Sequence, residues 1–342
     1  MLTRPAAKMY YSVAGRTVLI EAFDDWSFSA VSQLFAGWFL TTLPQSPTHK
    51  PDLTLRIRCG RTPPSIPTGL TVFEIALGGR CLTDNSSFYL KFDNSLIVFG
   101  SDTSADVDLW VDQPYDVSSA KVAQLISHAL SPAMRRCGVF EIHSAGVIPP
   151  DRTRAMMILG PSGSGKSTLT SRLAKCGWRY LSDDILLLQD CGNSLKVGAF
   201  RRFFALTAET LAAVDLPQGV FNESSGTAKE RITPQEHFDS YPIEQATPGY
   251  MIFTNVTRKP QSRLVSLTSA EAMTMLLRLC PWASYDKPIS EEHLRILARL
   301  ANTSSAFALH AGTDILNEPT LAAHLIQKSI AKPALVGQFY DA

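Results

Sequence analysis

A glycine-rich run at residues 160–168, with the sequence GPSGSGKST, restricts the fold of this chain more than any other feature. It matches the phosphate-binding pattern G-x-x-x-x-G-K-[ST] at every required position. Glycines let such a loop bend so that its backbone N–H groups point at phosphate oxygens, while Lys166 supplies a positive charge and Ser167 a hydroxyl for Mg²⁺. The run predicts a nucleoside triphosphate site formed by Gly160, Pro161, Ser162, Gly163, Ser164, Gly165, Lys166, Ser167 and Thr168.

The residues on either side of this loop have the pattern that the motif requires. Residues 155–159 are a short apolar run that is typical of a buried strand, and residues 167–175 have apolar positions at helical spacing. The helix is expected to end at Gly177, and its N-terminus would direct a partial positive charge at the phosphates. The alternative is a glycine-rich turn that only connects two elements, and the flanking strand and helix favour the phosphate site.

The composition favours an ordinary globular protein. The chain has 342 residues, 45% of them hydrophobic, and a net charge of +1, so no overall field attracts nucleic acid or an anionic membrane. No signal-peptide pattern or long apolar window is found, and the six cysteines form no C-x-x-C pair. We therefore expect a cytoplasmic protein without a nucleic-acid or membrane partner, whose metal is Mg²⁺ and not zinc.

The predicted secondary structure differs between two regions of the chain. Residues 1–115 are mostly strand-like, with one helix near 28–40, and predict a β-rich N-terminal accessory domain. A change follows at residue 119, where apolar residues at i, i+3 and i+4 spacing predict an amphipathic helix. We expect an α/β fold, in which a phosphate-loop catalytic domain at 116–342 is preceded by a smaller β-rich α+β domain.

A pair of aspartates follows the predicted helix. The strand expected at 178–181 ends at Ser182 and is followed by Asp183 and Asp184. A right-handed crossover would place this strand parallel to 155–159, so that both carboxylates emerge at the edge of the sheet that carries the loop. One carboxylate would ligate Mg²⁺ and the other would accept the proton of a hydroxyl acceptor. The alternatives are a turn cap or a water-mediated Mg²⁺ ligand.

Together these features resemble the catalytic domain of HPr kinase/phosphorylase, and more closely the HPr-kinase-like serine kinases found beside lasso-peptide clusters. The matching segments are residues 142–147, with the sequence IHSAGV, the loop at 160–167, and residues 181–184, with the sequence LSDD. The glycine-rich signature that follows the aspartates in HPr kinase/phosphorylases is not found. The resemblance therefore does not extend to HPr as the substrate or to hydrolysis of phosphorylated HPr.

The resemblance implies roles for individual residues. It places Lys166 on the phosphates, Ser167 and Asp184 on Mg²⁺, and His143 near the γ-phosphate. Asp183 is favoured slightly as the base, although the assignment within the aspartate pair stays open. His143 taken alone would more often be a histidine of the core. The resemblance to the family also implies a ring-like homo-oligomer, although no sequence feature requires one.

A polar stretch at 222–231 is a further candidate for nucleotide contact. It carries Lys229 and Arg231 among serine, glycine and threonine residues. Such a basic loop could close over the nucleotide and neutralise charge in the transition state, and an exposed solvated loop is an equal alternative. Two pairs, Arg201 with Arg202 and Arg258 with Lys259, are weaker candidates.

The function predicted from the sequence is an ATP- and Mg²⁺-dependent kinase that phosphorylates a hydroxyl, with a serine of a protein or peptide as the favoured acceptor. A small-molecule kinase with the same site is an alternative. A second alternative is a non-catalytic nucleotide-sensing switch, in which the bound triphosphate sets a conformation. The second aspartate favours transfer, because a sensor needs no carboxylate for an acceptor.

Overall fold

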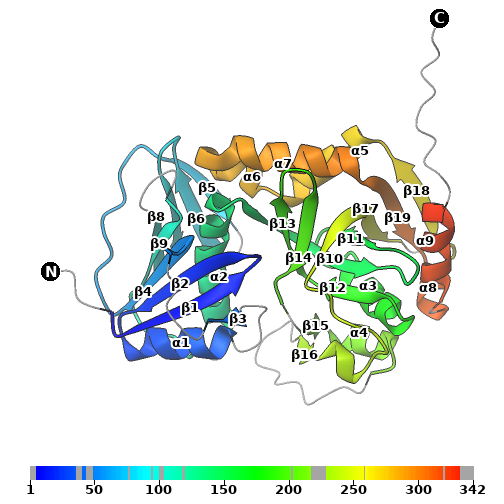
Figure 1. Ribbon diagram of the computed structural model, residues 1–342, viewed down its shortest axis with the longest axis horizontal. Coiled ribbons are helices and arrows are strands. Elements are labelled where there is room, and N and C mark those ends of the chain that lie inside the picture. Colours follow the sequence, from blue (N-terminus) through cyan, green and yellow to red (C-terminus); the bar gives the residue numbers. More distant parts are fainter. Residues whose placement is uncertain are drawn as a thin grey trace, which may run out of the picture. The chain divides into compact units, whose positions relative to one another are not determined.

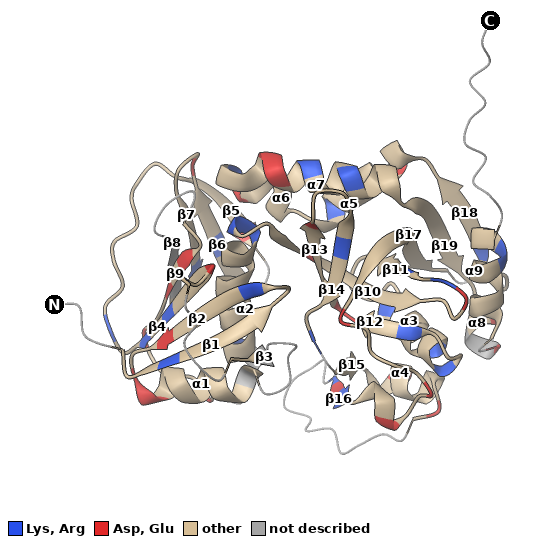
Figure 2. Ribbon diagram, viewed as in Figure 1, with Lys and Arg blue, Asp and Glu red and all other residues tan. Residues whose placement is uncertain are grey.

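The chain forms two compact units in the computed structural model (Figure 1). The structure describes residues 5–35, 41–43, 49–75, 78–93, 95–99, 104–117, 120–201, 203–216, 229–257, 259–318 and 320–331. The first unit comprises Met1–Glu141, Leu187–Asn193 and Cys280–Ile296, and the second comprises Ile142–Leu186, Ser194–Leu279 and Leu297–Ala342. Basic and acidic residues are interspersed in both units (Figure 2), in keeping with the net charge of +1.

A nine-stranded sheet forms the first unit, in the order β3-β1-β2-β4-β9-β8-β7-β6-β5. Its strands are β1 (Ala7–Val13), β2 (Arg16–Ala22), β3 (Thr41–Thr42), β4 (Leu53–Cys59), β5 (Thr71–Ile75), β6 (Gly79–Thr83), β7 (Phe88–Phe92), β8 (Ser95–Phe99) and β9 (Asp106–Val111). The β-rich character expected of the N-terminal residues is thus observed. The antiparallel β1 and β2 are joined by Ala14 and Gly15, both with positive φ, which is the conformation of a tight hairpin turn.

Helices α1 (Asp25–Phe35) and α2 (Ala120–Arg136) pack on this sheet. In α2 the apolar positions at helical spacing are buried, as the sequence predicts: Val122, Leu125, Ile126, Ala129 and Leu130. The short helices α6 (Trp282–Tyr285) and η3 (Lys287–Ile289) also belong to the first unit. Helix α7 (Ser290–Thr303) has residues in both units, which divide after Ile296. Helix α2 contacts β4 and β9 and therefore belongs to the first unit. The domain boundary expected near residue 115 stays a prediction.

A buried carboxylate ties α2 to the segment after α6. Asp286 is fully buried and accepts hydrogen bonds from Arg135 at 2.9 and 3.0 Å and from Arg136 at 3.0 and 3.1 Å. Both guanidinium groups are themselves only 1% exposed. Removing one member of such a group leaves a buried charge without compensation, which is far more costly than losing a surface ion pair.

We expect the substitution Asp286→Ala to lower the free energy of unfolding by about 3–5 kcal/mol. Chemical denaturation of the full chain measures this loss. The control is Asp215→Ala, because Asp215 is 79% exposed in its ion pair with Lys175 and should contribute no more than about 1 kcal/mol. A loss of no more than about 1 kcal/mol for Asp286→Ala would show that the buried group does not stabilise the first unit.

The second unit is built around an eight-stranded sheet with the order β11-β10-β13-β14-β17-β19-β18, in which β12 also pairs with β10 and β11 with β17. These strands are β10 (Val139–Ile148), β11 (Arg154–Leu159), β12 (Arg179–Ser182), β13 (Ile185–Asp190), β14 (Leu195–Ala199), β17 (Gln245–Val256), β18 (Arg263–Leu267) and β19 (Ser305–Ala311). Strands β15 (Phe204–Leu206) and β16 (Glu230–Ile232) form a separate pair.

Strand directions bring several loops to one edge of this sheet. β11, β17 and β19 are parallel neighbours, and β10 is antiparallel to both β11 and β12. β12 therefore runs parallel to β11, as expected, but β10 lies between them. The carboxyl ends of β12, β11, β17 and β19 consequently share an edge, where ligands of α/β sheets are commonly bound.

The helices of the second unit are α3 (Lys166–Lys175), α4 (Ala208–Ala213), α5 (Ser269–Leu279), α8 (Thr313–Asn317) and α9 (Leu321–Ala331), with a short turn η2 (Pro234–Glu236). Leu169 and Leu173 of α3 belong to the buried cluster that includes Ile158 of β11 and Ile326 of α9. Burying this apolar face fixes the start of α3 directly after the glycine-rich loop.

The expectation of a mixed α/β fold is confirmed by these two units. That the second unit is a phosphate-loop nucleotide-binding domain stays a prediction. No helix in the described part of the chain is long and apolar enough to cross a membrane.

Candidate functional site

The glycine-rich loop joins β11 to α3, as the sequence predicts, and three of its glycines have conformations that other residues rarely adopt. Gly160, Gly163 and Gly165 have φ values of 151°, 77° and 89°. At Gly160 there is also no space for a side chain, because a Cβ atom would lie 2.9 Å from the carbonyl oxygen of Thr254. The loop shape therefore depends on these glycines.

Lys166 folds back over the loop. Its Nζ donates hydrogen bonds to the carbonyl oxygens of Gly160 at 2.8 Å and Pro161 at 3.0 Å, and the residue is 6% exposed. Burial lowers the pKa of Lys166, while the charges of Asp184 and Asp183 oppose this decrease. The amine thus lies inside the curve of the loop, within electrostatic range of the aspartate pair.

Two hydroxyl contacts hold the loop and the start of α3 in place. Ser164 Oγ lies 3.0 Å from Thr254 Oγ1, which donates to the carbonyl oxygen of Leu159. Thr168 Oγ1 lies 3.0 Å from Thr210 Oγ1 of α4. Thr254 was not found by sequence reasoning, because its role depends on the pairing of β17 with β11 across about ninety residues of chain.

Asp183 is the buried member of the aspartate pair. It is 1% exposed, and its Oδ2 accepts a hydrogen bond of 3.0 Å from the backbone N–H of Ala205, whereas Oδ1 is buried without a partner among the described residues. Burial raises the pKa of Asp183 to about 7, and the negative charge of Asp184 adds to the increase. This carboxyl group therefore gains and loses a proton near neutral pH.

Asp184 has the opposite electrostatic character. Its Oδ1 lies 2.7 Å from His143 Nε2, and its Oδ2 accepts a hydrogen bond of 2.8 Å from Arg201 Nη1. Burial favours a higher pKa, but the hydrogen bond from His143 and the charge of Arg201 outweigh it and hold the pKa of Asp184 below its usual range. Asp184 is therefore a carboxylate across the ordinary pH range.

The contact between His143 and Asp184 joins two of the three segments of the sequence resemblance, and the pairing of β10 with β11 places the third, the loop, beside them. His143 lies on β10, which separates β12 and its aspartates from β11 and the loop, and its side chain is 50% exposed. Arg201, which follows β14, was only a weak candidate from the sequence, and its ion pair with Asp184 places it in the site. Arg202 lies outside the described residues.

Of the predicted basic loop, the structure describes Lys229 onward. The charge of Lys229 lowers the pKa values of Asp183, Asp184 and Lys166, so this residue lies near both parts of the site. Arg231 is on β16, with its Cζ 4.7 Å from the ring centroid of Phe203. Residues 217–228, which include most of the predicted loop, lie outside the described residues.

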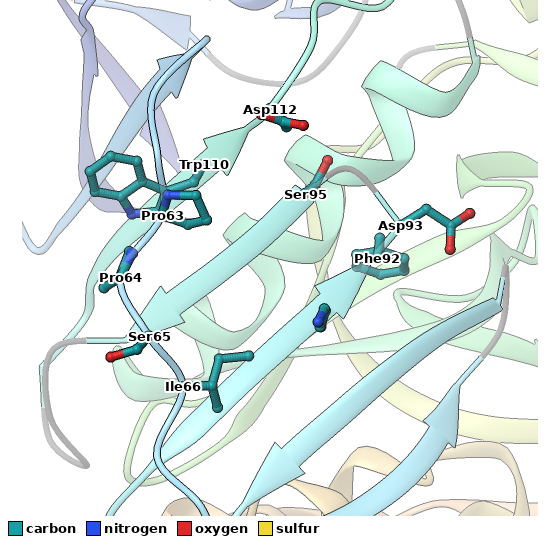
Figure 3. Close-up of a pocket in the computed structure, with 10 residues that line it drawn as sticks. Pro63, Pro64, Ser65, Ile66, Phe92, Asp93, Ser95, Trp110 and Asp112 are labelled. Atoms are coloured by element: carbon teal, nitrogen blue, oxygen red, sulfur yellow. The ribbon is translucent and has the colours of Figure 1, made fainter.

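A separate cavity of about 560 Å³ belongs to the first unit, between the segment 63–66 and residues of β7, β8 and β9 (Figure 3). It is lined by Pro63, Pro64, Ser65, Ile66, Lys91, Phe92, Asp93, Ser95, Trp110 and Asp112. Ser95 Oγ and Trp110 Nε1 are buried without a partner in the described part of the chain. None of the residues predicted for the site lines this cavity.

Comparison with known proteins gives a weak structural similarity. No protein-family model matches the chain. No curated protein matches its sequence. The structure resembles the HPr(Ser) kinase/phosphatase from Coxiella burnetii with a TM-score of 0.33 and 13% identity, over 56% of this chain and 90% of that chain. A similarity of this size assigns no activity, and the geometry of the site is the basis for function.

Proposed function

We propose that this protein is an ATP- and Mg²⁺-dependent phosphotransferase that moves the γ-phosphoryl group of the nucleotide to a hydroxyl group. The observation that best supports this proposal is the arrangement at one edge of the second sheet. There the loop after β11 and the aspartates after β12 lie on either side of His143 on β10. Phosphoryl transfer depends on positioning and on charge stabilisation, and this edge offers groups for both.

The loop supplies the binding half of the proposal. Its backbone N–H groups and the N-terminus of α3 form an anion site, and Lys166 already lies in the curve of the loop. A bound triphosphate would offer Nζ charged oxygens in place of the carbonyls of Gly160 and Pro161. Burial of Lys166 strengthens this exchange, because a partly desolvated cation gains more from an anionic partner.

The donor set near the loop fits Mg²⁺ and does not fit zinc. Ser167 offers a hydroxyl and Asp184 an ionised carboxylate, which are the hard oxygen ligands that Mg²⁺ prefers. The described residues contain no group of three or more His, Cys, Asp or Glu side chains that could hold a metal ion. Bound Mg²⁺ would neutralise phosphate charge, with its remaining ligands taken from phosphate and water.

Asp183 has the properties of the base. Its Oδ1 is buried without a partner among the described residues, so the carboxyl group keeps an unused acceptor beside the site. A pKa of about 7 is near the optimum for proton transfer at neutral pH, whereas the low pKa of Asp184 suits a metal ligand. His143 and Arg201 hold Asp184 in position.

The raised pKa of Asp183 also favours transfer over a nucleotide-sensing switch, since a sensor has no use for a proton acceptor. For the acceptor we keep the proposal of a serine on a protein or peptide, with a small molecule as the alternative. The expectations of a cytoplasmic location, of no nucleic-acid or membrane partner, and of a homo-oligomer stay predictions.

The test of this function is transfer from γ-labelled ATP to proteins of a cell lysate, followed by identification of the labelled product. We expect label on a hydroxyl side chain when Mg²⁺ is present, no label in excess EDTA, and no recovery with zinc, because the ligands are oxygens. The Lys166→Ala variant in the same lysate corrects for endogenous kinases. Full labelling in EDTA would contradict the metal assignment, and equal labelling by the variant would contradict the enzyme.

A further inference from the structure

A second cavity lies at the edge of the sheet that carries the loop. It has a volume of about 710 Å³ and is lined by Thr257, Lys259, Pro260, Gln261, Ser262, Arg263 and His310. These residues follow β17, begin β18 and end β19. All of them belong to the second unit.

Hydrogen bonds and a close backbone approach shape the wall of this cavity. The backbone N–H of Ser262 donates to Asp314 Oδ2 at 2.7 Å, and the backbone N–H of Gly312 donates to Ser262 Oγ at 2.8 Å. A Cβ atom at Gly312 would lie 2.7 Å from the carbonyl oxygen of Lys259, so only glycine allows these segments to meet. The cavity is thus formed before any ligand binds, as is usual for small-molecule sites.

The lining carries basic groups without acidic partners. Lys259, Arg263 and His310 form no ion pair with any carboxylate in the described ranges, and no Asp or Glu is among the lining residues. Arg263 and His310 are opposite each other in the antiparallel pairing of β18 with β19. Gln261 adds an amide that both donates and accepts hydrogen bonds.

The strand order places this cavity on the side of the loop away from the aspartates. The loop follows strand β11. On one side of β11 the sheet continues through β10 to β12, and on the other side it continues through β17 to β19. At the spacing of neighbouring strands, β19 is about 10 Å from β11. Val256 connects the two places, because its Cγ2 would lie 3.2 Å from a Cβ atom at Gly165 and the next residue, Thr257, lines the cavity.

We propose that this cavity binds the nucleoside end of the triphosphate held by the loop, an inference that rests on the proposed function. A nucleotide whose γ-phosphate faces Asp183 and Asp184 extends its nucleoside in the opposite direction, towards β17 and β19. Guanidinium groups stack on aromatic rings, which gives Arg263 a purine face to cover. The amide of Gln261 matches the donor and acceptor edge of adenine.

The experiment compares two ligands, Mg·ATP and inorganic tripolyphosphate, in fluorescence titrations of the full chain. We expect Arg263→Ala to weaken ATP binding about tenfold and to leave tripolyphosphate binding unchanged, because only ATP has a ring for the guanidinium to cover. Gln261→Ala should give a smaller loss in the same direction. The control is Arg154→Ala, an exposed arginine at the opposite end of β11, which should change neither affinity.

The unchanged tripolyphosphate affinity also shows that the Arg263→Ala variant is folded. Equal weakening of both ligands, or no change in either, would overturn the nucleoside assignment. It is also overturned if the parent binds the two ligands equally well, or if Arg263→Ala affects only the acceptor's KM. A different result would contradict the proposed function itself. That result is a Lys166→Ala variant that binds Mg·ATP and tripolyphosphate as tightly as the parent does.

Discussion

Replacing Lys166 by alanine will abolish triphosphate binding and turnover while the protein stays folded. The side chain contributes a cation that lies inside the loop, 2.8 Å from the carbonyl oxygen of Gly160, and phosphate oxygens are its natural partners there. Its removal takes a partly desolvated charge out of the second unit, so we expect the fold to be retained. Binding assays with Mg·ATP and thermal unfolding measure the two halves of this prediction.

The matched control is Lys175→Ala at the other end of the same helix. Lys175 donates to the carbonyl oxygen of Val214 and pairs with the exposed Asp215, so its loss should cost little stability and no affinity for nucleotide. If Lys166→Ala bound and used ATP as the parent does, the match of the loop to the phosphate-binding pattern would be accidental. A large drop in melting temperature for Lys166→Ala alone would instead show a structural role.

Local patterns in the sequence were sufficient for the central part of the site. The strand, loop and helix around residues 160–168 depend on glycine conformations and on apolar periodicity within about twenty residues. Such patterns are less informative at the first hairpin, where only Ala14 and Gly15 separate β1 from β2. There the two turn residues lie within an almost continuous run of strand-forming residues, and only Gly15 is of a type that marks turns.

The rest of the site depends on contacts between distant segments. Arg201 reaches Asp184 only because β14 belongs to the same sheet, and Thr254 reaches Ser164 only through the parallel pairing of β17 with β11. The cavity lined by Arg263 and His310 likewise requires the register of β18 on β19. Such pairings are fixed by the packing of the whole sheet and not by residue type.

The variants Asp183→Asn and Asp184→Asn should lose different properties of the enzyme. Asparagine keeps the shape of aspartate but removes its charge. Asp183→Asn should leave Mg·ATP binding near normal and reduce transfer by roughly 10²–10⁴-fold, the usual contribution of a general base. Asp184→Asn should weaken Mg·ATP binding and recover in part at higher Mg²⁺ concentration, because the lost group is a metal ligand whose low pKa kept it ionised.

The pH dependence separates these roles further. A base must be unprotonated to act, so the transfer rate of the parent should rise with pH through about 7, the pKa to which burial raises Asp183. Asp183→Asn should lose this inflection, whereas Asp184→Asn should retain one at saturating Mg²⁺. Rates of transfer to the identified acceptor between pH 5 and pH 9 provide the measurement. If both variants transferred phosphate at the parental rate, neither aspartate would take part in the reaction, and the assignment of base and metal ligand would be wrong; absence of transfer by the parent itself would favour the nucleotide-sensing switch.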